Sequence, residues 1–258
     1  MELFDTHAHL NNDDYDADRE ATLERARAAG VRLVVNVGYS LESSRASVEL
    51  AGRCEMVYAA VGIHPHDAGT APEGYLETLA ELAGHPKVVA LGEMGLDYYR
   101  DLSPRPAQQK VFREQLALAR RLDLPVIIHD RDAHGDLMAI LQEDGLGPAG
   151  GVMHCYSGSW EMARQCLTMG FYISIAGPVT FPNAPRLKEI AARAPLDRLL
   201  VETDAPYLTP APHRGKRNEP AYVRFTAEEV ARQRAMGPEE LAQACAENGR
   251  RLFRIKGN

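Results

Sequence analysis

Short runs of apolar and β-branched residues alternate with longer helical patterns along the whole chain, and this alternation restricts its possible folds more than any other feature. Repeated strand and helix units predict a parallel sheet covered by helices. Eight units can be traced, which predicts an α/β protein with a (β/α)8, or TIM, barrel. The expected strands are Leu3–Phe4, Leu33–Val37, Val57–Val61, Val88–Leu91, Val126–Ile128, Gly151–Met153, Phe171–Ile175 and Leu199–Val201.

Chain length agrees with one barrel of this kind. The 258 residues are close to the ~250 residues that are typical of the class. No Ser/Gly-rich linker, charge block or short repeat divides the sequence, so we expect a single domain over residues 1–258. The clearest expected helices are Arg19–Ala29, Tyr75–Ala83, Gln108–Leu122 and Leu187–Ala194, with Pro238–Phe253 closing the outer ring.

The sequence also bears on location. Its first ten residues contain acidic side chains and histidines where a signal peptide would have a basic and then an apolar segment. No apolar stretch approaches the roughly 20 residues that a membrane-spanning helix needs. The four cysteines form no C-x-x-C pair, which suits a reducing compartment and argues against thiolate zinc sites. We therefore expect a cytoplasmic protein that does not enter a membrane.

Charge limits the ways in which this chain can act on nucleic acid. A formal net charge of −7 argues against a protein that coats or wraps a polyanion, so a nucleic-acid enzyme needs a local basic patch. The irregular segment Tyr207–Tyr222, here called the basic loop, follows the last expected strand and contains Arg214, Lys216 and Arg217. Such loops usually serve binding or catalysis in a barrel. We expect these three side chains to bind substrate phosphates, with a solvated charged loop as the alternative.

Side chains that bind metal ions follow the apolar runs at corresponding positions. The carboxyl ends of barrel strands converge on one pocket, so residues far apart in the sequence can meet there. A single histidine is more often an ordinary surface or core residue, but the shared position after the strands argues against coincidence. We therefore expect one metal centre, formed by His7, His9, Glu93, His129, His154 and Asp204.

Roles within this centre follow from the side-chain chemistry. His7 and His9 are two residues apart, so an extended strand presents both imidazoles on one side. Glu93 can bridge two ions because a carboxylate offers two oxygens, whereas an imidazole offers one lone pair. Asp204 can contact both metal and water and act as the base, with Glu202 on the same side. We expect two divalent ions and leave Mg, Mn and Zn open, and we expect Glu93 and Asp204 to be the catalytic residues.

The remaining histidines have weaker assignments. His64 and His66 also follow a strand but exceed the needs of two four-ligand sites, so we expect them to contact phosphate or to support the ligands. Ordinary surface roles are expected for His85, in a turn, and His134, at the start of a helical stretch. The sequence does not decide between roles for His213.

These residues lie in a set of motifs that resembles the TatD family of metal-dependent DNases, within the amidohydrolase superfamily of barrels. The resemblance spans nearly the whole chain and implies metal binding by the same six residues. It also implies hydrolysis of DNA, often from a 3′ end. The intact first H-x-H places the chain with members that can hold two ions. The motifs are FDTHAHL at 4–10, GIHPH at 62–66, GEMGLDYYR at 92–100, PVIIH at 125–129, HCYSG at 154–158, ETDAPYL at 202–208 and RGKRNEP at 214–220.

The expected function is therefore hydrolysis of phosphodiester bonds in DNA by a metal-activated water, at single-stranded or frayed 3′ ends. An amidohydrolase or esterase acting on a small substrate is the alternative among enzymes, because the same barrel and activated water serve carbonyl centres. A non-catalytic binding protein would keep the barrel without needing the six ligands. The sequence gives no sign of an obligate protein partner.

Overall fold

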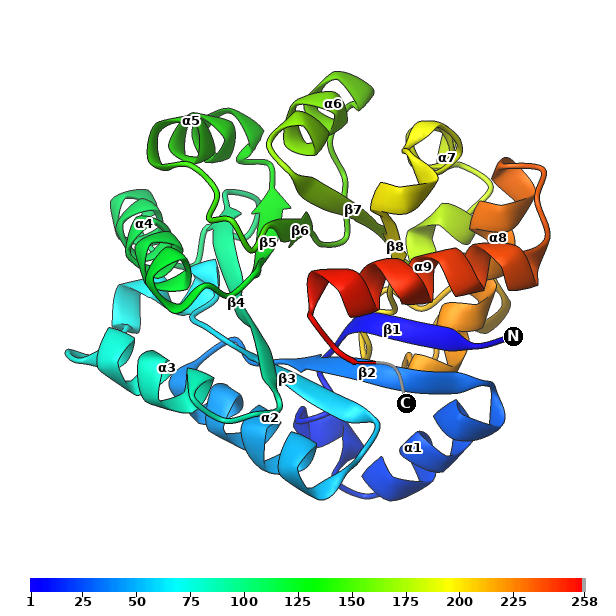
Figure 1. The fold of residues 1–258 in the computed structure, drawn as a ribbon, viewed down its shortest axis with the longest axis horizontal. Coiled ribbons are helices and arrows are strands. Elements are labelled where there is room, and N and C mark those ends of the chain that lie inside the picture. Colours follow the sequence, from blue (N-terminus) through cyan, green and yellow to red (C-terminus); the bar gives the residue numbers. More distant parts are fainter. Residues whose placement is uncertain (257–258) are drawn as a thin grey trace.

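Eight parallel strands form the frame of the molecule in the computed structural model, which describes residues 1–256 (Figure 1). Each strand pairs with the next one in the chain, in the order β1 to β8. The expected number and direction of the strands are confirmed. The strands are β1 (Leu3–Ala8), β2 (Val31–Val37), β3 (Val57–Val61), β4 (Val88–Asp97), β5 (Val126–Arg131), β6 (Gly151–Met153), β7 (Phe171–Ile175) and β8 (Leu199–Val201).

The seam between β8 and β1 closes the sheet into a barrel through a few contacts just beyond β8. Ala8 and Ala205 form an isolated parallel bridge. The amide of His9 donates to the carbonyl of Ala205 at 2.7 Å, and that of Asp204 donates to the carbonyl of His7 at 2.9 Å. The seam thus brings the H-x-H pair directly beside the acidic residue that follows the last strand.

Helices cover the outside of the barrel between successive strands (Figure 1). Among the described residues, no helix is both long enough and apolar enough to span a membrane. The helices expected from the sequence are present, with ends that differ by at most three residues, and the expected bounds Tyr75–Ala83 agree at both ends. The nine helices of residues 1–256 are α1 (Arg19–Ala28), α2 (Leu41–Arg53), α3 (Tyr75–Ala83), α4 (Arg105–Leu122), α5 (His134–Asp144), α6 (Trp160–Thr168), α7 (Pro185–Arg193), α8 (Val223–Gln233) and α9 (Pro238–Leu252).

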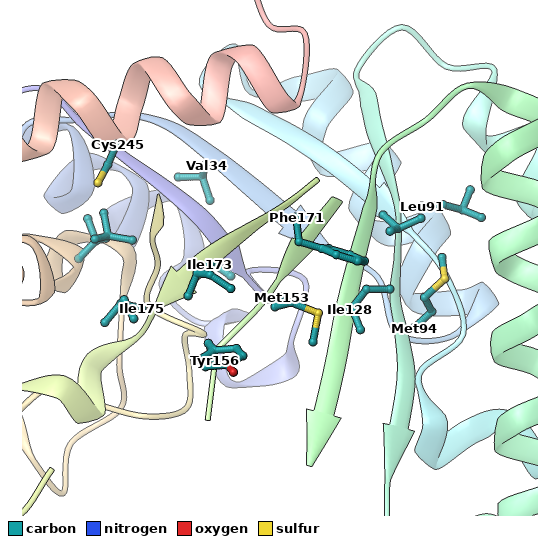
Figure 2. Packing of buried hydrophobic residues seen from close by; sticks show 14 of the residues in the cluster. Val34, Leu91, Met94, Ile128, Met153, Tyr156, Phe171, Ile173, Ile175 and Cys245 are labelled. Carbon is teal, nitrogen blue, oxygen red and sulfur yellow. The ribbon is translucent and has the colours of Figure 1, made fainter. Parts of the chain in front are cut away.

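Neighbouring residues of each strand face two different apolar layers. Val34 and Ile128 belong to the large layer between strands and helices, whereas Val35 and Ile127 belong to a smaller cluster inside the barrel. The alternation follows from the two-residue period of a strand. Figure 2 shows part of the outer layer, where Cys245 of α9 points from the helix toward the strands.

The two ends of the barrel interior differ in chemistry. At the amino ends of the strands, Phe4 packs against Phe253, with ring centroids 6.1 Å apart. Residues of α9 and the segment after it, including Leu252 and Ile255, join the same interior cluster. The polar side chains described below lie at the other end, where the strands finish. Apolar side chains therefore fill the barrel at the amino ends of the strands, and the polar side chains lie at the carboxyl ends.

Three strands extend further at their carboxyl ends than the sequence predicts, and β2 begins at Val31 where Leu33 is expected. The expected ends at Phe4, Leu91 and Ile128 are wrong, because β1, β4 and β5 continue to Ala8, Asp97 and Arg131. Most of their added residues are polar or glycine, with Ala8, Met94 and Leu96 as the apolar exceptions, so the run of apolar residues breaks although the backbone pairing persists. At Gly95, in this added part of β4, φ is 146° and a Cβ would lie 1.9 Å from the carbonyl oxygen of His129. Glycine permits the close approach of β4 and β5 at this point.

Candidate metal centre

The six residues expected to bind metal, here called the strand-end cluster, meet at the carboxyl ends of the strands. Three are within strands: His7 in β1, Glu93 in β4 and His129 in β5. The others directly follow a strand or lie within three residues of its end. All six side chains are buried or partly buried. The full set is His7, His9, Glu93, His129, His154 and Asp204.

The H-x-H pair directs two ring nitrogens at one point. Nε2 of His7 and Nε2 of His9 lie 3.2 Å apart. Nδ1 of His9 lies 2.8 Å from the carbonyl oxygen of Val37. Because a carbonyl oxygen can only accept, Nδ1 of His9 must carry the hydrogen, and Nε2 of the neutral ring has a free lone pair. A backbone contact of this kind is how metal-binding histidines are commonly held.

Glu93 lies between two groups of histidines. Its Oε2 is 3.5 Å from Nε2 of His7 and 3.6 Å from Nε2 of His9. Its Oε1 is 2.8 Å from Nδ1 of His129 and 2.9 Å from Nε2 of His154. Each carboxylate oxygen thus faces a different group, which is the arrangement that a bridge between two ions requires.

Asp204 completes the group around the H-x-H pair. Its Oδ1 lies 3.3 Å from Nε2 of His9 and 3.6 Å from Nε2 of His7. The residue has φ of 57°, a left-handed conformation that aspartate and asparagine adopt more readily than most residues. Asp204 is therefore held by a specific turn after β8 with its carboxylate at the ring nitrogens.

Electrostatics keep both carboxyl groups ionised. Burial alone would raise the pKa of Glu93, but the charge of His154 and hydrogen bonds from His129 and His154 hold it well below its ordinary value. Burial also opposes ionisation of Asp204, yet the hydrogen bond with His9 and the nearby histidine charges lower its pKa. Both residues are carboxylates at neutral pH, the form that binds cations.

Three buried acidic residues hold the ring orientations and the seam. Oε1 of Glu202 accepts from Nδ1 of His154 at 3.0 Å, which directs Nε2 of that ring at Glu93. Oδ2 of Asp97 lies 3.1 Å from Nε2 of His129 and 2.9 Å from Nε2 of His66. Partners of this kind fix tautomer and orientation in metal sites.

Asp5, the third acidic residue, lies beneath the H-x-H pair. Its Oδ2 accepts from the hydroxyl of Thr203 at 2.6 Å, and its Oδ1 accepts from the amide of Thr203 at 2.9 Å. Burial raises the pKa of Asp5 to about 8. These bonds tie β1 to the segment that presents Asp204.

Sequence reasoning assigned no role to Asp5 or Asp97, although both lie in quoted motifs. The period of a strand could have found Asp97, since Glu93, Gly95 and Asp97 share one face of β4 while the residues between them belong to the apolar core. Asp5 likewise precedes His7 by two positions on β1. Strands that are traced by their apolar residues end at the first polar side chain. Asp5 and Asp97 therefore lie outside the expected strands.

His64 faces the cluster as a hydrogen-bond donor. Its Nδ1 accepts from the amide of His66 at 3.0 Å, so the hydrogen of the neutral ring must be on Nε2. That Nε2 lies 3.6 Å from Oε1 of Glu93. Burial holds the pKa of His64 well below its ordinary value, so the ring is neutral. A protonated Nε2 has no lone pair for a metal, and the role of His64 in contacting phosphate or supporting the ligands stays a prediction.

The three cations of the basic loop have different surroundings. The guanidinium of Arg214 lies over the ring of Phe181, 4.7 Å from its centroid, and Lys216 is exposed. Arg217 instead pairs with Asp18 through two contacts of 2.8 Å and lies over the ring of Tyr15. The structure therefore gives Arg217 an internal partner, and its contact with substrate stays a prediction.

The histidines with weaker assignments have other neighbours. Nδ1 of His134, at the start of α5, lies 2.7 Å from a carboxylate oxygen of Asp130. The ring of His213 stacks on that of Tyr222 at 4.1 Å between centroids. Nδ1 of His85 accepts from the amide of Lys87 within a turn.

The described residues contain three groups whose ligand atoms all lie within 4.8 Å of one another and could hold a metal ion. Two of these groups share His7, the third shares no residue with them, and together the three include every member of the strand-end cluster as well as His64 and Glu202. Their imidazole and carboxylate donors suit divalent cations. The groups are His7, His9 and Asp204; His7, His154 and Glu202; and His64, Glu93 and His129.

Comparisons with known proteins agree with this geometry. Residues 4–254 match the family model described as TatD related DNase. The metal-dependent hydrolase YabD of Bacillus subtilis is 51% identical over 253 residues, covering 98% of this chain and 99% of its own. A protein of Cronobacter sakazakii named 3′-5′ ssDNA/RNA exonuclease TatD is 39% identical over 256 residues, covering 97% of each.

A solved structure is similar throughout. The crystal structure of YjjV, a TatD homologue from Escherichia coli K12, superposes with a TM-score of 0.93 at 35% identity and covers 98% of both chains. The similarity therefore extends over nearly the whole length of both chains.

Proposed function

Because the chain belongs to the TatD family of metal-dependent hydrolases, we propose that it hydrolyses phosphodiester bonds in single-stranded DNA, from accessible 3′ ends. The observation that supports this most directly is the position of Glu93, whose two oxygens face two separate groups of metal-binding side chains. The names of relatives such as the Cronobacter protein support nucleic acid as the substrate class.

We propose that the cluster holds two divalent ions bridged by Glu93. The first site consists of His7, His9 and Asp204, and the second of His129 and His154. The donors fit this assignment because His9 has a free Nε2 lone pair and both carboxyl groups are ionised. Nδ1 of His7 is buried without a hydrogen-bond partner among the described residues. Mg, Mn and Zn all fit the donor types.

Asp204 is proposed as the base. Bound divalent ions lower the pKa of water to about 7 and stabilise charge on a phosphate. The carboxylate of Asp204 is partly exposed, with 14% of its side-chain surface accessible, whereas only 5% of Glu93 is accessible. Asp204 can thus accept a proton from the attacking water while Glu93 stays a ligand.

His64 is proposed as a donor to the substrate. Its neutral ring presents an N–H bond from Nε2 toward the region between Glu93 and His129. A phosphate oxygen there would accept this hydrogen bond and gain a neutral partner that does not compete for the metal ions. Arg214 and Lys216 of the basic loop are proposed to contact phosphates further along the strand.

An amidohydrolase or esterase reaction is the second candidate, since the fold also occurs in proteins that act on other bonds. The Saccharomyces cerevisiae structure described as an amidohydrolase shares the fold at 19% identity and a TM-score of 0.83. The exposed cations Arg100, Arg131 and Lys216 lie at or beyond the carboxyl ends of strands and favour an anionic polymer over a neutral small substrate.

The test measures metal content and cleavage on the same preparation. A 5′-labelled single-stranded oligonucleotide should give a ladder that shortens from the 3′ end, and EDTA should abolish it. The Asp204→Asn variant serves as the inactive control. Absence of cleavage of single-stranded DNA and of bis-p-nitrophenyl phosphate by protein with full metal content would overturn the proposal. Hydrolysis of amide or carboxylic ester substrates alone would establish the second candidate.

A further inference from the structure

Exposed apolar side chains gather around the mouth of the barrel. Among residues 1–256, three large apolar side chains are more than half exposed: Tyr99 at 58%, Leu102 at 66% and Tyr207 at 53%. Each lies in a segment that follows the carboxyl end of a strand. Tyr99 and Leu102 follow β4, and Tyr207 follows β8. Exposed aromatic rings at a polar site are a feature that binding of a ligand would explain.

Tyr207 is fixed next to the H-x-H pair. Its ring centroid lies 6.1 Å from that of His9. The Nδ2 group of Asn12 donates to its hydroxyl at 3.3 Å. Its backbone is held on both sides, since its amide donates to the carbonyl of Asp204 at 2.9 Å and its carbonyl accepts from Nδ2 of Asn218 at 2.5 Å. The ring is therefore exposed on a rigid segment.

Tyr99 is fixed to the other side of the cluster through Asp97. Oδ1 of Asp97 accepts from the amides of Tyr99 at 3.0 Å and Arg100 at 2.8 Å. The second oxygen of the same carboxylate contacts His129 at 3.1 Å. Two residues of extended chain span at most about 7 Å, so Tyr99 starts close to the site.

Arg131 adds a cation to this second ring. Its guanidinium lies over Tyr99, 4.2 Å from the ring centroid, and its side chain is exposed. Arg131 is the last residue of β5, the strand that contains His129. Tyr99 and Arg131 together offer a flat apolar surface beside a positive charge.

The order of the strands puts the two tyrosines on opposite sides of the mouth. β4 and β8 are four places apart in a barrel of eight strands, so a chain crossing the metal centre between them would meet one ring on each side. A molecule with a net charge of −7 repels a polyanion at long range, and stacking on rings supplies affinity that does not depend on charge.

We propose that Tyr207 and Tyr99 stack nucleobases on either side of the cleaved bond, so that the enzyme recognises unpaired bases as well as phosphates. This inference rests on the proposed function and specifies the substrate class as single-stranded nucleic acid. A duplex hides both faces of each base within its stack, and a small phosphodiester has no base at all. Stacking is tolerant of sequence because every base has a flat face.

The test compares leucine and phenylalanine at each tyrosine. Tyr207→Leu and Tyr99→Leu remove the aromatic face from exposed positions, whereas Tyr207→Phe and Tyr99→Phe keep it. Tyr58→Leu is the matched control, because Lys87 Nζ lies 4.2 Å over that ring at the amino end of β3, far from the mouth. The substrates are a single-stranded oligonucleotide, the same oligonucleotide with abasic sites at its three 3′-terminal positions, and bis-p-nitrophenyl phosphate.

Each leucine variant should lower kcat/KM on the normal oligonucleotide about tenfold, mainly through KM. The loss on the abasic oligonucleotide should be at least fivefold smaller. The phenylalanine variants and Tyr58→Leu should keep the wild-type preference for bases. Equal losses on normal and abasic oligonucleotides, or phenylalanine variants as weak as leucine variants, would overturn the stacking role. Wild-type protein that cleaves none of the three substrates would instead overturn the proposed function.

Discussion

The strand-end cluster and the basic loop both consist of residue types that the sequence marks as functional, but the fold controls their positions differently. Each member of the cluster lies on a strand or close behind one, where the parallel ladders fix its backbone. The basic loop contains only short turns at Ala211–His213 and Pro220–Tyr222. Side-chain type therefore predicts a contact well where the barrel fixes the backbone, and poorly where a loop allows several partners.

The largest expected effect is the loss of activity on substitution of Asp204 in the strand-end cluster. Asp204→Asn keeps the volume and tolerates the left-handed backbone of this residue, with φ of 57°, but removes the base and one ligand charge. We expect kcat on bis-p-nitrophenyl phosphate to fall by about 10³-fold or more. Initial rates measured on protein of known metal content check this. The matched control, Asp197→Asn, alters an acid at the opposite end of β8 and should leave kcat unchanged.

Metal removal is expected to have the second largest effect, on stability. Without cations, the carboxylates of Glu93 and Asp204 are buried among partners that satisfy them only in part. A divalent ion at 100 times its dissociation constant contributes ~2.7 kcal/mol, which is roughly 5–10 °C in Tm for a chain of this size. Thermal unfolding with EDTA and after readdition of Mn or Zn measures the shift. His9→Ala should reduce it and Arg214→Ala should not; an equal shift in both variants would place the ion elsewhere.

The difference between the strand-end cluster and the basic loop also explains which parts of the structure could be predicted from the sequence. Alternating apolar runs predict the eight-stranded barrel, because only strands at equal intervals with helices between them bury those runs. The same regularity brings together His7, Glu93 and Asp204. Asp97 escapes this reasoning because its role depends on a neighbouring strand that brings His129 to its oxygen.

Loops and caps show the limit of local patterns. Arg217 has the residue type of a phosphate ligand, yet it forms an ion pair with Asp18, which is remote in sequence. Gly30, Gly84 and Gly170 each follow a helical run, the position at which a left-handed glycine often ends a helix. Gly30 and Gly170 have φ of 94° and 97°, whereas Gly84 has φ of −71° and is not left-handed. Such outcomes depend on packing between distant segments, which no local pattern contains.

A smaller effect, on substrate binding, is expected for the basic loop, and it should distinguish Arg214 and Lys216 from Arg217. The double variant Arg214→Ala/Lys216→Ala should raise KM for a single-stranded oligonucleotide several-fold more than KM for bis-p-nitrophenyl phosphate. If both side chains contact phosphates, the log–log dependence of binding on salt should become shallower by about 1.4, from roughly 0.7 per contact. Equilibrium binding of the oligonucleotide at several salt concentrations measures this slope, with all variants made in the inactive Asp204→Asn protein. Arg217→Ala should change the slope less, because Asp18 already pairs with it.

The smallest expected effect tests whether Arg217 is a structural residue. Hydrogen bonds from Arg217, and then from Arg25, hold the pKa of Asp18 well below its ordinary value. A carboxyl group whose pKa is lowered by folding stabilises the protein above its unfolded pKa, about 3.9, and loses that contribution as the pH falls toward its folded pKa. Asp18→Asn should therefore lower Tm slightly at pH 7, and the difference from wild type should shrink below about pH 4. Thermal unfolding from pH 7 to pH 3 measures the difference, and Arg217→Ala should show the same trend. A difference that is constant with pH, or a loss of oligonucleotide binding in Asp18→Asn as large as in the Arg214/Lys216 double variant, would show that this pair belongs to the substrate surface instead.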